Sequence, residues 1–156
     1  MTAAFTHLNP KGSRFSAGQF GVHYAAHALE AAVAEVSHHR ARFMARTRES
    51  AIDIDMRLIK ADLNAPLHDL RRLTKSAPGI YDAKRYGEPQ ALGAALREAG
   101  SSGVVYNSVR HPGGWCAGVF RPKALRHARP AAHIALHWDG KRISHWFHKR
   151  EPTLLG

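Results

Sequence analysis

The stretch AHIALHWDGKRISHWF, residues 132–147, constrains the fold more than any other part of the chain. Apolar and polar residues alternate on both sides of Asp139 and Gly140. Alternation with a period of two is typical of a strand with one buried face, and an Asp-Gly pair between two such runs favours a tight reversal. The pattern therefore predicts a β-hairpin, and the fold must contain an antiparallel pair of strands near the end of the chain.

Helical and strand-like patterns both precede this hairpin. Residues 26–46 carry apolar side chains near helical spacing, many alanines and no glycine or proline, which predicts a helix. Residues 52–58 alternate like a strand with one buried face. The remaining predicted elements are a short helix through LHDLRRL (67–73), a loop over 74–88, a helix from Pro89 to Gly100, and the strands GVVYNS (103–108) and WCAGVF (115–120), joined by the turn HPGG.

This order predicts an α+β fold. Helices and strands do not alternate regularly, as they do in folds built around a parallel sheet. The 156 residues contain no internal repeat and no linker-like stretch, and the length suits one domain. We therefore predict a single domain over residues 1–156, with mixed, mainly antiparallel sheets and flanking helices.

The chain is strongly basic. Lys and Arg number 23 against 12 Asp and Glu, which gives a formal net charge of +11. Such an excess indicates an acidic partner, but the basic residues are not gathered on one recognition helix or arm. A nucleic acid, a nucleotide substrate, an acidic protein and a positive surface that only aids solubility all remain compatible with it.

The sequence predicts a cytoplasmic location. Its first residues lack the apolar region of a secretory signal, and no run approaches the 18 apolar residues that can span a bilayer. Cys116 is the one cysteine of the chain, so no internal disulfide is possible, which suits a reducing compartment. Because it lies among strand-like apolar residues, we interpret Cys116 as a small buried side chain and not as a nucleophile.

Several common kinds of site are not supported. The 12 histidines include His133 and His137, but their segment has the pattern of a strand and no further ligand pattern completes a metal site, so we predict no metal. The segment HPGGWCAG lacks the spacing of a phosphate-binding loop. Ser108 lacks the G-x-S-x-G context of a hydrolase nucleophile.

Residue types near the amino terminus suit chemistry on a nucleotide. Arg14 could pair with phosphate oxygens, the ring of Tyr24 could stack on a heterocycle, and the carboxylate of Glu35 could stabilise the cation that forms when a glycosidic bond breaks. Taken singly, each has an ordinary structural explanation: a surface charge, a core tyrosine and a solvated helix position. The residue types alone leave both explanations open.

Two long stretches of the chain resemble the RES-domain family. They are RFSAGQFGVHYAAHALEAAVAEVSHHR, which starts at Arg14, and IYDAKRYGEPQALGAALREAGSSGVVYNSVRHPGGWCAGVFRP, which ends at Pro122. The arginine, glutamate and serine for which that family is named match Arg14, Glu35 and Ser108. The family's tyrosine matches Tyr24, and a histidine one helical turn beyond the glutamate matches His39.

The resemblance implies a toxin of a bacterial toxin–antitoxin pair, with an ADP-ribosyltransferase-like fold and a helix-turn-helix antitoxin as partner. Its substrate would be NAD⁺, which such proteins hydrolyse or phosphorolyse, or whose ADP-ribose they transfer to a protein. The implied catalytic residues are Glu35, Tyr24 and Arg14. Arg14 and Tyr24 would also bind the substrate, together with His39 and Ser108. Family members usually carry a longer segment before the arginine, so with 13 residues before Arg14 we expect a shortened member.

The alternative reading is a basic nucleic-acid-binding module without enzymatic activity. Its support is the net charge of +11, and no helix-turn-helix, RNA-binding aromatic motif or zinc finger accompanies that charge.

Overall fold

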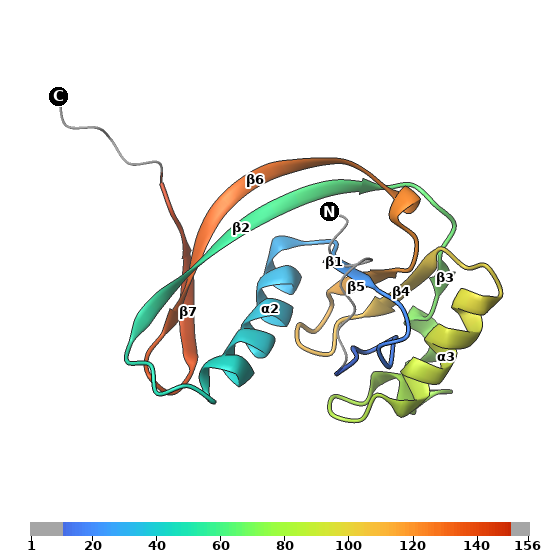
Figure 1. The fold of residues 1–156 in the computed structure, drawn as a ribbon, viewed down its shortest axis with the longest axis horizontal. Coiled ribbons are helices and arrows are strands. Elements are labelled where there is room, and N and C mark those ends of the chain that lie inside the picture. The colour runs from blue at the N-terminus through green and yellow to red at the C-terminus, as the bar shows by residue number, and fades with distance from the viewer. Residues whose placement is uncertain (1–10, 151–156) are drawn as a thin grey trace. The chain divides into compact units, whose positions relative to one another are not determined.

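A computed structural model describes residues 11–150 of the chain (Figure 1). They fall into two compact units, one formed by the residues up to Glu35 with Leu63–Arg126, and the other by Val36–Asp62 with the residues from His127 onward. The α+β fold class is confirmed, while the single domain over the whole chain stays a prediction. The elements in order are β1 (His23–Ala26), α2 (Leu29–Met44), β2 (Ile52–Leu63), β3 (His68–Asp69), the 3-10 helices η1 (Arg71–Thr74) and η2 (Pro78–Tyr81), α3 (Gly87–Glu98), β4 (Gly103–Asn107), β5 (Trp115–Val119), the 3-10 helix η3 (Pro122–Ala124), β6 (Leu125–Trp138) and β7 (Ile143–His148).

The first unit is built on a four-stranded sheet with the order β1-β5-β4-β3. β5 pairs antiparallel with both β1 and β4, whereas the two-residue strand β3 pairs parallel with β4. The expectation of mainly antiparallel pairing is therefore confirmed. The turn HPGG joins β4 to β5, as predicted.

The strand register places several chemically notable side chains on one face of this sheet. Cys116 of β5 lies between Ala26 of β1 and Tyr106 of β4, and the neighbouring row joins Tyr24 to Gly118. Residues two apart on a strand share a face, so Tyr24, Cys116 and Tyr106 point the same way. Ser108, which directly follows β4, continues this row of positions, and its N–H donates to the carbonyl of Gly114 over 2.9 Å.

Phe15 is the centre of the core on this face. Its side chain is fully buried and meets the ring of Tyr106 edge-on, with ring centroids 4.9 Å apart. Buried residues from the sheet and from the loops around it complete the cluster: Leu70, Ile80, Val104, Cys116 and Phe120. Because Arg14 directly precedes Phe15, the packing of this one aromatic ring fixes the backbone from which the arginine side chain leaves.

The second unit contains the three-stranded sheet β2-β6-β7 and the predicted hairpin. The Asp139 carboxylate accepts from the N–H groups of Lys141 and Arg142 over 2.9 and 2.8 Å, and Gly140 adopts a φ of 97°. Ile134, Leu136 and Trp138 of β6 are buried, as the alternating pattern predicts, but Ala135 between them is buried as well. The hairpin is confirmed, with residues 139–142 forming its connection.

Two predicted helices differ from the structure. The helix expected over 26–46 is α2, but it begins at Leu29 because residues 23–26 pair with β5 as β1. The helix expected over 67–73 is wrong. There the N–H of Leu70 donates to Val105 of β4 and the side chain of Asp69 caps the N–H of Arg71, so the backbone continues as strand β3 and the short helix η1.

The other helical and loop predictions are close to what is observed. α3 begins two residues before the expected Pro89 and ends at Glu98, and the loop over 74–88 contains the single turn η2. Within residues 11–150, no helix combines the length and the apolar character that crossing a bilayer requires.

A substitution at Gly93 of α3 tests whether close packing of this helix against the backbone of Phe15 stabilises the fold next to Arg14. A Cβ atom at this position would collide with the backbone carbonyl of Phe15, whereas a Cβ at Gly87, the first residue of the same helix, would meet no atom within 4 Å. We expect Gly93→Ala to lower the free energy of unfolding by about 1–3 kcal/mol, because overpacking moves the backbone beside Arg14. Gly87→Ala, the control, should leave it unchanged or slightly raised. Urea unfolding measures both, and equal stability of the two variants would contradict this account.

Candidate active site

Glu35 and Ser108 are in direct contact, although 73 residues separate them. The Ser108 hydroxyl donates to Oε1 of Glu35 over 2.6 Å. The Ser108 hydroxyl oxygen also accepts from the N–H groups of Arg110 and His111 over 3.2 and 3.0 Å. A hydroxyl has one hydrogen to donate and two positions to accept, so all three are occupied. The turn after β4 thus orients the hydroxyl of Ser108 toward the carboxylate of Glu35.

Arg14 is buried without an acidic partner among the described residues. Its side chain is 8% exposed, and Nη1 donates to the carbonyls of Ile80 and Asp82 over 3.1 and 2.9 Å. The guanidinium also lies over the ring of Tyr86, 4.6 Å from its centroid. No carboxylate of residues 11–150 forms an ion pair with it. Since a buried charge is costly unless it is paired, this arrangement suits an anionic ligand.

Tyr24 bonds to both chain neighbours of Arg14, to the side chain of Ser13 and to the backbone of Phe15. Its hydroxyl bonds to Oγ of Ser13 over 2.7 Å and accepts from the N–H of Phe15 over 2.9 Å. Burial raises the pKa of Tyr24, so the phenol stays protonated at neutral pH. The side chain is nevertheless 36% exposed, which leaves part of the ring available for stacking.

Cys116 lies beside these groups and is buried. It is 2% exposed, and burial together with the nearby charge of Glu35 raises the pKa of its thiol to about 11. Arg14 and Ser108 act on the same thiol in the opposite direction, so all three of these side chains are near it. The interpretation of Cys116 as a small buried side chain is confirmed.

His39 is the one predicted site residue that belongs to the second unit. It lies on α2 four residues after Glu35, is exposed, and meets the ring of His38 with centroids 5.5 Å apart. Residues four apart share a helix face, as the sequence indicates. Its predicted role in orienting a substrate group stays a prediction.

Other histidines have partners within the second unit. Nδ1 of His137 lies 2.6 Å from the Asp53 carboxylate, and Nδ1 of His127 lies 2.9 Å from that of Asp62. Within residues 11–150, no group of three or more His, Cys, Asp or Glu side chains is arranged to hold a metal ion.

The structure adds groups that the sequence did not indicate. The carbonyls of Ile80 and Asp82 hold the guanidinium, and a backbone carbonyl has no signature in a sequence because every residue carries one. Tyr86 could have been noticed as an aromatic residue in a polar loop, but only the fold shows that it lies against Arg14.

Comparison with known proteins identifies the family. The fold and the Arg14–Tyr24–Glu35–Ser108 arrangement define an α+β protein with a polar, partly buried site in its first unit. The RES domain model matches residues 1–139, so the chain belongs to the RES domain family, which confirms the resemblance. The uncharacterized protein y4oC of Sinorhizobium fredii (strain NBRC 101917 / NGR234) is 32% identical over 142 residues, which cover 91% of this chain and 58% of that protein. This chain therefore matches little more than half of the relative's length.

The raised pKa of Cys116 predicts a specific pH dependence of stability. The unfolded thiol titrates near its ordinary value of 9.0 and the folded thiol near 11, so the folded state holds this proton more tightly. The resulting contribution is fully present below pH 9 and is lost as the pH rises toward 11, by about 2–3 kcal/mol in total.

Urea unfolding of the wild type and of Cys116→Ala between pH 8 and about pH 11 measures this contribution together with its coupling to Tyr106, whose pKa the charge of Cys116 raises. We expect the wild type to lose more of its free energy of unfolding than Cys116→Ala as the pH rises over this range. If the free energies of unfolding of the two proteins change with pH in the same way, the folded state does not hold the Cys116 thiol in its neutral form.

Proposed function

We propose that this protein cleaves the nicotinamide–ribose bond of NAD⁺. The observation that carries the proposal is the Glu35 carboxylate held by the Ser108 hydroxyl at 2.6 Å, in the same compact unit as a buried Arg14 that has no ion pair among the described residues. Membership of the RES domain family supports a toxin-like, NAD-related role at the level of the family.

In this reaction the protein mainly orients the substrate and stabilises charge. The bond between C1′ of the ribose and the nicotinamide nitrogen breaks, and its electron pair stays with nicotinamide, which leaves as a neutral molecule. Positive charge develops on the ribose, and an oxygen of the acceptor then bonds to C1′ and releases its proton. A carboxylate close to that ribose stabilises the transition state electrostatically, which is the role we assign to Glu35.

Arg14 would bind the pyrophosphate. Nη1 of Arg14 donates both of the hydrogen bonds to the carbonyls of Ile80 and Asp82. Nε and Nη2 donate neither of these two bonds. These two nitrogens form the edge of a guanidinium that can donate two parallel hydrogen bonds to phosphate oxygens. Tyr24 would stack on the nicotinamide or its ribose through the exposed part of its ring. Because the three hydrogen-bonding positions of its hydroxyl are occupied, Ser108 would act on the nicotinamide–ribose portion by orienting Glu35. His39 would orient one of the groups that bind the substrate.

The acceptor distinguishes three forms of the reaction. Water would give ADP-ribose, inorganic phosphate would give a phosphorylated ADP-ribose, and a protein would become ADP-ribosylated. Incubation of the purified protein with NAD⁺ and each acceptor, followed by quantification of nicotinamide, tests the proposal and separates the three. Absence of nicotinamide with every acceptor would contradict it. Nucleic-acid binding that survives physiological salt, in a protein indifferent to NAD⁺, would favour the non-enzymatic alternative.

A helix-turn-helix antitoxin is the partner we propose, and family membership is its support. Coexpression with a helix-turn-helix protein encoded beside this gene should yield a complex that copurifies and releases less nicotinamide than the isolated chain. A complex with undiminished activity would contradict an antitoxin role for that protein.

Replacement of Glu35 by glutamine tests its electrostatic role. Glutamine keeps the size and an oxygen that accepts from Ser108, but it removes the negative charge that opposes the ribosyl cation. We expect Glu35→Gln to lower kcat by about a hundredfold or more, while affinity for NAD⁺ changes little. Glu30→Gln is the matched control, because Glu30 lies exposed in the first turn of the same helix. Nearly full turnover of Glu35→Gln would assign the catalytic carboxylate elsewhere.

A further inference from the structure

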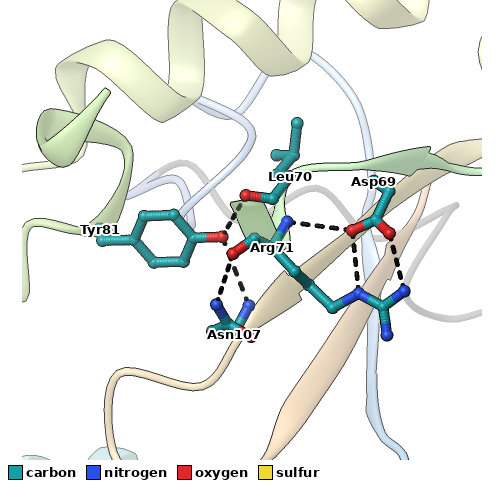
Figure 2. A network of polar contacts seen from close by, with 5 residues as sticks. All are labelled: Asp69, Leu70, Arg71, Tyr81 and Asn107. Carbon is teal, nitrogen blue, oxygen red and sulfur yellow. Dashed lines mark hydrogen bonds and ion pairs between the residues drawn. The ribbon is translucent and has the colours of Figure 1, made fainter. Parts of the chain in front are cut away.

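Tyr81 lies at the centre of a polar network that holds the segment after β3. Its hydroxyl donates to the carbonyl of Leu70 over 2.7 Å and accepts from the N–H of Asn107 over 3.4 Å. The Asn107 side chain in turn donates to the carbonyl of Arg71 over 2.9 Å. Figure 2 shows these contacts, with the tyrosine hydroxyl between the Leu70 carbonyl and Asn107. Burial raises the pKa of Tyr81, so the hydroxyl keeps the proton that it donates to Leu70.

The neighbours of Tyr81 hold the predicted substrate arginine. Ile80 and Asp82, one residue before and one after, supply the two carbonyls that accept from Nη1 of Arg14. A shift of the Tyr81 backbone therefore moves both acceptors together. Phe15 and Tyr24 fix the backbone position from which the Arg14 side chain starts. The carbonyls of Ile80 and Asp82 fix the position of its guanidinium group.

The network also reaches the other half of the site. Asn107 is the last residue of β4 and directly precedes Ser108, the partner of Glu35. Arg110, whose N–H donates to the Ser108 hydroxyl, also donates from Nη2 to the carbonyl of Ala83 over 2.8 Å. Segment 80–83 is thus tied both to Arg14 and to the turn that orients Ser108.

We propose that Tyr81 is a positioning residue for substrate binding, whose hydroxyl sets the place of the Arg14 guanidinium through the carbonyls of Ile80 and Asp82. This inference rests on the proposed function, in which Arg14 binds the pyrophosphate. Tyr81 itself need not touch the substrate. Because pyrophosphate binding is common to the ground state and the transition state, a misplaced Arg14 should weaken binding and leave the chemical step nearly unchanged.

Tyr81→Phe is the direct test, since it removes the hydroxyl and keeps the ring. We expect Kd for ADP-ribose, measured by calorimetry, and KM for NAD⁺ to rise by about fivefold or more, with kcat within about twofold of the wild type. The matched control is Ser101→Ala, which removes a buried hydroxyl that bonds to His68 and Gly103 at the other end of β4. It should lower the unfolding temperature without changing Kd. Unchanged Kd in Tyr81→Phe, or an equal rise in Ser101→Ala, would overturn the inference.

A double-mutant cycle distinguishes action through Arg14 from a general loosening of the fold. In an Arg14→Gln background, Tyr81→Phe should change Kd for ADP-ribose by less than about twofold, because the group it positions is gone. Should Arg14→Gln fail to fold, Arg14→Lys serves as the background, since lysine cannot reproduce the planar two-nitrogen edge. A full, independent effect of Tyr81→Phe in that background would overturn the inference.

The outcomes separate this inference from the proposed function. If the wild type binds ADP-ribose but releases no nicotinamide, the proposed reaction is wrong, and the Kd cycle still decides the role of Tyr81. If the wild type releases nicotinamide and Tyr81→Phe matches it in Kd and KM, only the inference is wrong. If the wild type neither binds ADP-ribose nor releases nicotinamide, both are wrong.

Discussion

The hydrogen bond from Ser108 to Glu35 is the contact on which the rest of the site depends. It joins the turn after β4 to helix α2, two segments that come together only in the folded chain. The N–H groups of Arg110 and His111 occupy the acceptor positions of the same hydroxyl, so its hydrogen is directed at the carboxylate. Strand β4, the turn after it and the first part of helix α2 therefore act together to hold one negative charge in place.

Arg14 provides the complementary charge, and its surroundings explain why it can be buried. Two carbonyls and the ring of Tyr86 replace part of its hydration, while no carboxylate of the described residues neutralises it. Tyr24 bonds to the Ser13 side chain before it and to the backbone N–H of Phe15 after it. In the proposed reaction, the cation would bind phosphate and the anion would stabilise a ribosyl cation, and preorganisation of this kind is a main source of electrostatic catalysis.

Patterns of hydrophobicity predicted the long elements, and contacts between distant segments decided the short ones. The hairpin around Asp139, helices α2 and α3 and strands β4 and β5 were all evident, because each buries a regular face. β1 was missed, since four residues carry too little period to separate them from the helix that follows. β3 was mistaken for a helix because its two residues depend on pairing with β4. At the candidate site, Arg14, Tyr24, Glu35 and Ser108 were predicted through family resemblance, whereas the backbone carbonyls around Arg14 could come only from the fold.

A crystal structure of the Glu35→Gln variant soaked with NAD⁺ tests the central claim most directly, because slow turnover should leave the dinucleotide intact. The account predicts pyrophosphate oxygens within hydrogen-bonding distance of Nε and Nη2 of Arg14. It also predicts that C1′ of the nicotinamide ribose faces the side chain at position 35. A dinucleotide bound with its pyrophosphate away from Arg14, or with its nicotinamide ribose remote from position 35, would contradict it.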